Sequence, residues 1–175
     1  MTDSLRLADP RPAVRALPRE SAVIVRHYDD PERVELARAL ISICREKNNR
    51  VLIAGDARLA LALGADGLHL PETMLSKGSR RWRPWRRPGM LLSAAAHSPK
   101  ALVGATYLGV DFALLSPVFP TTSHPGANSI GPSRFAAWTL NAGLPVFALG
   151  GVNAHNKKRI LFAGAAGWAG IEGLS

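Results

Sequence analysis

The sequence has little cysteine: Cys44 is the single one among 175 residues. One thiol cannot close an intramolecular disulfide, which excludes a disulfide-stabilised scaffold, and we interpret Cys44 as a small core residue on the apolar face of a helix. Long apolar runs are also lacking, since no stretch approaches the roughly 20 residues of a membrane-spanning helix. The N-terminus lacks the basic-then-apolar pattern of a signal peptide. We therefore expect a cytoplasmic protein with no membrane partner.

Acidic residues are scarce: 13 Asp and Glu stand against 22 Lys and Arg, which gives a formal net charge of +9. Tryptophan alternates with basic residues in one segment, 77–87, whose basic members are Lys77, Arg80, Arg81, Arg83, Arg86 and Arg87. Such a pattern could bind nucleic acid through phosphate pairing and base stacking. Because prolines and glycines break any helix here and no nucleic-acid-binding motif is present, we interpret the segment as a solvated loop and do not expect nucleic-acid binding. An acidic substrate or partner for this loop stays open.

The length of the chain fits a single domain, 1–175, with one core, and its 47% hydrophobic content is ordinary for a globular protein. Short apolar runs alternate with helical stripes along the whole sequence. Eight of these runs are predicted strands: Leu5–Ala8, Ala22–Arg26, Arg50–Ala54, Gly67–His69, Met90–Ala95, Phe112–Ser116, Val146–Leu149 and Trp168–Ile171.

Helix start and stop signals lie between these strands. Asp30 is predicted to cap a helix with Pro31 in its first turn. Another helix is predicted from Asp56 or Arg58 through Leu63, and Gly64 ends it. Pro99–Leu108 is predicted to be helical and to end at Gly109. Two further helices are expected over Ser133–Asn141 and Asn153–Ala163.

Strands that alternate with helices indicate a parallel sheet with right-handed crossovers. The simplest closed arrangement is an α/β fold, a compact (β/α)8 TIM barrel; an open doubly wound sheet is the alternative. A typical barrel takes about 250 residues, so this one must be trimmed. Little room is left for a first helix between Pro10 and Pro18, and the last helix is missing because nothing follows Leu174 to form it.

The run Pro145–Asn153 joins an apolar strand to a double glycine, Gly150-Gly151. Glycine allows the backbone to approach a ligand closely, and the amides of a turn that enters a helix favour an anion. Late in an α/β barrel this position commonly holds phosphate. An ordinary strand–turn–helix joint is the alternative interpretation.

Histidines follow several predicted strands, which places them where barrel enzymes carry their active groups. His27, His69, His97 and His124 are predicted on this face, whereas His155 falls within a helix. Clustered imidazoles favour proton transfer. We expect no metal site, because no short-spaced pair of metal-binding side chains is present. The loop Ser116–His124 adds hydroxyl groups that could hold phosphate oxygens opposite the double glycine.

Five segments together resemble the thiamine phosphate synthase/TenI family of phosphate-binding barrels. They are Leu59–Leu70 (LALALGADGLHL), His97-Ser98, Gly109–Pro125 (GVDFALLSPVFPTTSHP), Pro145–Asn153 (PVFALGGVN) and Ala163–Ala169 (AGAAGWA). The resemblance implies a thiazole-phosphate-like ligand and a role in thiamine biosynthesis. The family's synthase joins a pyrimidine diphosphate to a thiazole phosphate and releases diphosphate with magnesium.

The diphosphate end of the family site is altered in this sequence. Arg26 is kept from the family pattern Gln-x-Arg-x-Lys, but Tyr28 replaces its lysine. The usual Asn-Asp pair falls on Ala54-Gly55, and a second carboxylate is lost near Met74, where only Glu72 could substitute. Magnesium requires hard oxygen ligands. We therefore expect no cofactor.

The thiazole-phosphate end is better kept. Besides Arg26 at the diphosphate end, the resemblance implies that the ligand-binding residues are Thr121, Ser123, His124, Gly150, Gly151 and Ile171. Glu172 replaces a serine there and would repel phosphate if it faced the ligand.

The TenI branch isomerises a thiazole ring, and the resemblance implies that His97 is the catalytic acid/base in that reaction. Three functions stay open: a thiazole tautomerase, which the sequence favours, a diverged synthase, and a barrel that binds a ligand or partner without catalysis. The oligomeric state is also open.

Overall fold

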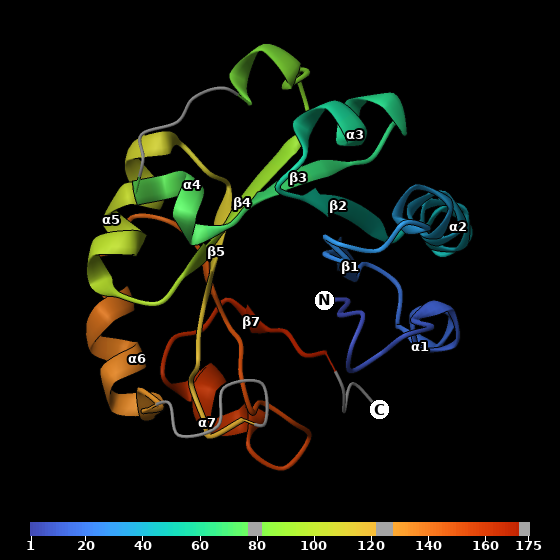
Figure 1. The fold of residues 1–175 in the computed structure, drawn as a ribbon. Coiled ribbons are helices and arrows are strands. Elements are labelled where there is room, and N and C mark those ends of the chain that lie inside the picture. The colour runs from blue at the N-terminus through green and yellow to red at the C-terminus, as the bar shows by residue number, and fades with distance from the viewer. Residues whose placement is uncertain (77–81, 122–127, 172–175) are drawn as a thin grey trace. The chain divides into compact units, whose positions relative to one another are not determined.

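The computed structural model describes residues 1–76, 82–121 and 128–171. These residues form two compact units (Figure 1). The first unit comprises 1–69 and 82–91, and the second comprises 70–76, 92–121 and 128–171. Both are α/β, with parallel strands and connecting helices. None of the described helices is long and apolar enough to span a bilayer.

The first unit begins with helix α1 (Arg11–Ala16) and strand β1 (Ala22–Val25). Helix α2 (Arg33–Glu46), strand β2 (Arg50–Ala54), helix α3 (Ala57–Ala62), strand β3 (Gly67–Leu70) and the 3-10 turn η1 (Arg83–Trp85) follow. Strands β1, β2 and β3 pair in that order and in parallel, with Val25 opposite Ile53 and Ala54 opposite His69. Their carboxyl ends therefore share one edge.

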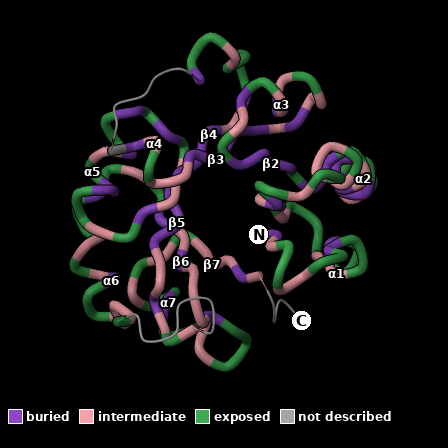
Figure 2. Tube along the Cα trace, in the orientation of Figure 1, coloured by how far each residue is buried: buried purple, intermediate pink, exposed green. Residues whose placement is uncertain are grey.

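The second unit contains helix α4 (Glu72–Ser76), strand β4 (Leu91–Ala96), helix α5 (Pro99–Leu108) and strand β5 (Phe112–Leu115). Helix α6 (Gly131–Thr139), strand β6 (Val146–Ala148), helix α7 (Lys157–Phe162) and strand β7 (Gly167–Trp168) complete it. The four strands pair sequentially and in parallel, and Ala96, Leu115, Ala148 and Trp168 lie opposite one another in turn. Figure 2 shows that buried residues concentrate along the strands, whereas the helices alternate between buried and exposed positions.

Helix α5 shows why the local sequence signals work. The Ser98 side chain accepts a hydrogen bond from the Ala101 amide, Pro99 occupies the first turn, and Gly109 adopts the left-handed conformation that ends the helix. The predicted boundaries of this helix are confirmed.

An aspartate before two of the strands repeats the same contact. The Asp66 amide donates to the Val51 carbonyl, and its carboxylate accepts from the Val51 amide at 2.8 Å. Asp111 does the same with both backbone groups of Leu92. Each aspartate thereby fixes the register of its strand against the preceding one.

The predicted first strand, Leu5–Ala8, is wrong, because residues 4–8 form turns and a bend. The Asp3 carboxylate accepts from the amides of Leu5 and Arg6, and the Leu7 amide donates to the Asp3 carbonyl. This local turn takes the backbone groups that a strand would need. Seven of the eight predicted strands are present in the described residues, and the last is shorter than expected. Closure into a barrel stays a prediction, and the predicted absence of a last helix concerns residues outside those described.

Candidate functional site

The candidate site of the second unit lies at the carboxyl edge of its parallel strands. His97 directly follows β4, Ser116 directly follows β5, and Gly150 comes two residues after β6. Adjacent strands are about 4.8 Å apart, so β4 and β6 are separated by roughly 10 Å. That separation suits a small phosphate-bearing molecule held between His97 and the Gly150 turn.

The double glycine is required by close packing within the fold. Gly150 and Gly151 have φ angles of 89° and 65°, which side chains rarely adopt. A Cβ on Gly150 would lie 2.8 Å from the Cα of Pro117, and one on Gly151 would lie 2.8 Å from the Cβ of Phe119. The turn therefore packs directly against the loop after β5.

Three successive backbone amides of this turn have no acceptor among the residues that the structure describes. The Leu149 amide donates to the Leu115 carbonyl and the Asn153 amide donates to the Asn156 side chain. Between them, the amides of Gly150, Gly151 and Val152 donate no hydrogen bond within the described residues. Consecutive free amides in a turn can bind an anion.

Asn156 braces the same turn from the other side. Its Nδ2 donates to the Gly151 carbonyl at 2.8 Å, and its Oδ1 accepts from the Asn153 amide. The Asn153 side chain accepts from the amides of His155 and Asn156. The predicted start of the helix over Asn153–Ala163 is wrong, because these side-chain bonds hold a turn and α7 begins at Lys157. The candidate anion donors are therefore amides of the turn and not of a helix.

The loop after β5 is hydrogen-bonded to this turn. The Val118 amide donates to the Leu149 carbonyl, and the Phe119 amide donates to the Gly150 carbonyl at 3.0 Å. Thr121 follows two residues later and is half-buried. Ile171 is half-buried beyond β7. The predicted binding residues Ser123 and His124, and Glu172 with them, lie outside the described residues.

His97 contacts a carboxylate that the sequence analysis considered only as a metal ligand. Its Nδ1 is hydrogen-bonded to Oε2 of Glu72, the first residue of α4. Both side chains are partly exposed, by 48% for His97 and 33% for Glu72. The capping bond of Ser98 fixes the backbone immediately after His97. The pair has the arrangement of a carboxylate-oriented general base.

In the first unit, Arg26 directly follows β1, and His69 lies in β3 opposite Ala54 of β2. Nη1 of Arg26 lies 3.7 Å from Oδ2 of Asp3. Burial, together with the positive charge of Arg26, lowers the pKa of His69 to about 3. His27 is buried as well. His69 is therefore neutral near pH 7, and among the histidines that the structure describes near a strand end, His97 is the partly exposed one.

The residues expected at a magnesium site do not fit one. Ala54 and Gly55 offer no side-chain ligand, and Nη2 of Arg33 donates to the Ala54 carbonyl at 2.5 Å. The positive charge of this guanidinium would repel a magnesium ion at the same position. Glu72 is engaged by His97. Among the described residues, no group of three His, Cys, Asp or Glu side chains could hold a metal.

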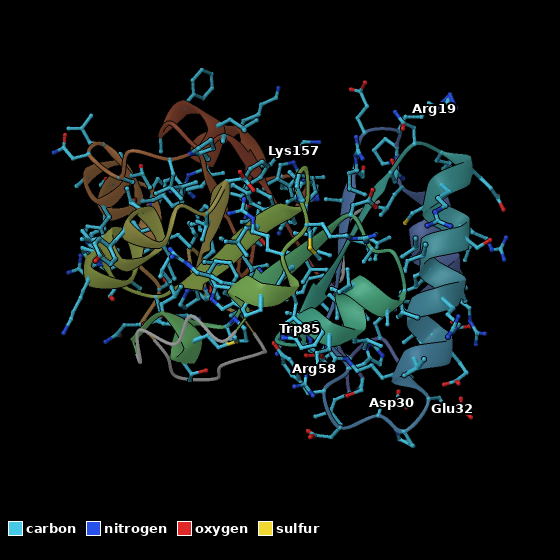
Figure 3. The ribbon with its side chains drawn as sticks, turned by 90° about the horizontal axis from the view of Figure 1, so that it is seen from above. Arg19, Asp30, Glu32, Arg58, Trp85 and Lys157 are labelled. Carbon is cyan, nitrogen blue, oxygen red and sulfur yellow. The ribbon has the colours of Figure 1, made fainter. Side chains whose placement is uncertain are left out.

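The two tryptophans of the basic loop differ in their surroundings. Trp82 is buried, and the Arg58 guanidinium lies 4.8 Å from the centre of the Trp85 ring, as the labelled side chains in Figure 3 illustrate. Arg83, Arg86 and Arg87 are exposed. Lys77, Arg80 and Arg81 lie outside the described residues. In the described part of the segment, Trp82 belongs to the core and Trp85 is half-buried beneath the exposed Arg58.

Sequence reasoning missed three of these contacts. The Glu72–His97 pair joins residues 25 positions apart, and the Arg33–Ala54 bond joins residues 21 apart, so no local pattern could have revealed either. The role of Asn156 had a signal, since asparagines commonly form side-chain turns and the pair Asn153 and Asn156 flanks one.

Comparison with known proteins places this geometry in context. The family model described as thiamine monophosphate synthase matches residues 13–174. A protein of Geobacter sulfurreducens named "Putative thiamine-phosphate synthase" is 36% identical over 155 residues, which cover 87% of this chain and 72% of the relative. A "Thiamine-phosphate synthase" of Chlorobium luteolum is 32% identical, with 82% of this chain and 68% of the relative covered. Among solved structures, a thiamine phosphate pyrophosphorylase from Pyrococcus furiosus is 24% identical with a TM-score of 0.74, covering 96% of this chain and 81% of that one. That last similarity supports the fold.

Proposed function

Because the chain belongs to the thiamine monophosphate synthase family, we propose that it binds a thiazole-phosphate-like ligand through the turn Gly150–Val152. The observation that carries this proposal is the run of three amides that donate no hydrogen bond within the described residues. Asn156 fixes the opposite side of the turn, so the amides need little reorganisation to receive phosphate. The basic residues Lys157, Lys158 and Arg159 at the start of α7 add favourable charge nearby.

The reaction that we propose is that of the relatives, a transferase of the thiamine-phosphate synthase class in diverged form. It would join a pyrimidine diphosphate to the thiazole phosphate with release of diphosphate. Arg26 is the cation kept for the diphosphate. Since the residues at Ala54 and Gly55 do not fit magnesium, we derive no step through a metal and expect slow turnover.

A second candidate is isomerisation of the thiazole ring by proton transfer at His97. The specific observation that favours it is the contact between His97 Nδ1 and Glu72. This reaction would need neither diphosphate nor metal. The sequence favours a tautomerase because His97 is kept while the residues expected for diphosphate and magnesium are altered, whereas the names of the relatives favour the transferase.

Calorimetry with thiazole phosphate and with the matching thiazole alcohol tests the ligand. We expect binding of the phosphate form and at least tenfold weaker binding of the alcohol. Asn156→Ala should weaken binding of the phosphate form, whereas Asn141→Ala, an exposed asparagine after α6, should not. Equal affinities for phosphate and alcohol would contradict the proposal.

Product analysis then separates the two reactions. Incubation with both substrates should yield thiamine phosphate if the transferase proposal holds. Binding of thiazole phosphate without any condensation product, but with exchange of thiazole-ring protons into deuterated water, would assign the chain to the second candidate. Binding with neither product nor exchange would leave a ligand-binding protein and would refute both reactions.

A further inference from the structure

The hydrogen bond between Glu72 and His97 determines which nitrogen of the imidazole carries the proton. Nδ1 faces the carboxylate oxygen, and a carboxylate can only accept a hydrogen bond. Nδ1 therefore carries the proton. In the neutral ring the lone pair is then confined to Nε2, which makes no hydrogen bond within the described residues.

We propose that Glu72 is the positioning residue that holds His97 as the Nδ1–H tautomer, so that Nε2 accepts a proton from a ligand bound at the Gly150 turn. This inference deepens the proposed function and rests on its ligand site. A histidine held in this way has one defined basic atom, whereas a free imidazole favours the opposite tautomer and rotates about its side-chain bonds.

The backbone supports this orientation at both partners. His97 is preceded by the buried end of β4 and followed by Ser98, whose side chain caps α5. Glu72 opens α4, which lies beside α5 (Figure 1). The two side chains therefore meet between elements that pack against each other in the second unit.

The proton transfer balances without a co-reactant. Nε2 takes a proton from the ligand, and the electrons of the broken bond stay on the ligand. The resulting imidazolium is paired with the Glu72 carboxylate. Nε2, whose proton can exchange with solvent in the meantime, then delivers a proton to a different ligand atom, so that the net result is an isomer with no change in charge or composition.

The tautomer can be measured without any ligand by long-range 1H–15N correlation of the histidine rings near pH 8.5, at which an ordinary imidazole is neutral. We expect the Nδ1–H pattern for His97, assigned by its loss in His97→Asn. Exposed His155, which has no carboxylate contact in the described structure, provides the internal comparison. Glu72→Ala should convert the His97 pattern to that of His155, whereas Glu72→Gln, whose amide oxygen can still accept, should keep the Nδ1–H form. A His97 pattern that matches His155 in the unmodified protein, or that is unchanged in Glu72→Ala, would overturn the inference.

A second readout separates this inference from the proposed function. In an exchange assay with thiazole phosphate, Glu72→Ala should slow proton exchange about 10- to 100-fold while its affinity for the ligand, from calorimetry, stays within twofold. Loss of affinity together with an unchanged tautomer would contradict a positioning role. Absence of exchange in the unmodified protein would remove the isomerase candidate, and the tautomer measurement would still decide the inference about Glu72.

Discussion

Single residues determine the shape of the turn between β6 and α7. A Cβ on Gly151 would contact both Phe119 and the Pro120 carbonyl, whereas one on Gly109, with a similar φ of 69°, would meet nothing within 4 Å. Gly109→Ala should therefore lower the free energy of unfolding only by the backbone strain, about 1 kcal/mol. Gly151→Ala should lower the free energy of unfolding clearly more. Urea denaturation of both variants measures the difference. Equal losses would show that the loop after β5 can move away from the turn.

His69 makes stability depend on pH in a defined direction. Its pKa is about 3 in the folded protein and near 6.5 when unfolded, so below pH 6.5 the unfolded chain binds a proton that the folded one does not. Above pH 6.5, the free energy of unfolding keeps the full contribution of neutral His69. As the pH falls from 6.5 toward 3, the free energy of unfolding decreases by at most about 1.4 kcal/mol per pH unit. In denaturant titrations from pH 7 to 5, His69→Gln should lose less free energy of unfolding than the unmodified protein does. Exposed His155→Gln should lose as much as the unmodified protein. A His69→Gln slope equal to the unmodified slope would contradict burial of a neutral imidazole.

At the scale of elements, the repeated aspartate before a strand suggests a stabilising substitution. Ala166 precedes β7 and its amide donates to the Val146 carbonyl, as Asp66 and Asp111 do with Val51 and Leu92. Ala166 is exposed and lacks the carboxylate that would accept from the Val146 amide. Ala166→Asp should therefore stabilise the protein by about 1 kcal/mol and raise Tm by roughly 2–4 °C.

Thermal unfolding measures this effect, and Ala166→Asn provides a control of the same shape without charge, which should gain less. Asp111→Ala should destabilise the protein because it leaves the Leu92 amide without its carboxylate. A fall in Tm for Ala166→Asp would show that β7 does not follow the pattern of β3 and β5.

Elements were predictable where local chemistry and long-range packing agree. Helix α5 has its cap, first-turn proline and terminal glycine in sequence, and its limits followed from them. The failures at Leu5–Ala8 and at the start of α7 share a cause, because Asp3 and Asn153 bind nearby amides and stabilise turns. Helix α2 likewise begins at Arg33, after a turn in which the Asp30 carboxylate accepts from the Glu32 amide.

At the scale of the whole molecule, the sequence also predicted the family, and the loss of the magnesium ligands stays a prediction. We expect that calorimetry with magnesium chloride detects no binding tighter than about 1 mM, since the donors that hard cations need are lacking at Ala54 and Gly55. Glu72→Ala should leave this result unchanged, because the carboxylate is engaged by His97. Micromolar affinity would show that residues outside those described, or Glu72 after rearrangement, bind the ion.

The positions of candidate groups on strand ends followed from the alternation of elements, whereas their contacts did not. Nothing local indicates that Glu72 binds His97, that Arg33 bonds to the Ala54 carbonyl, or that Pro117 requires Gly150. Each contact arises only when distant segments pack together. The free amides of Gly150–Val152 are likewise a property of the folded turn, and they carry the central claim.

Amide NMR during titration with thiazole phosphate tests that claim most directly. The account predicts the largest shifts, with saturation, at the amides of Gly150, Gly151 and Val152, and weaker shifts of the same amides with inorganic phosphate. Gly109 and Gly143, which also have left-handed backbones, should stay unshifted. Saturable shifts elsewhere, with these three amides unchanged, would contradict the account.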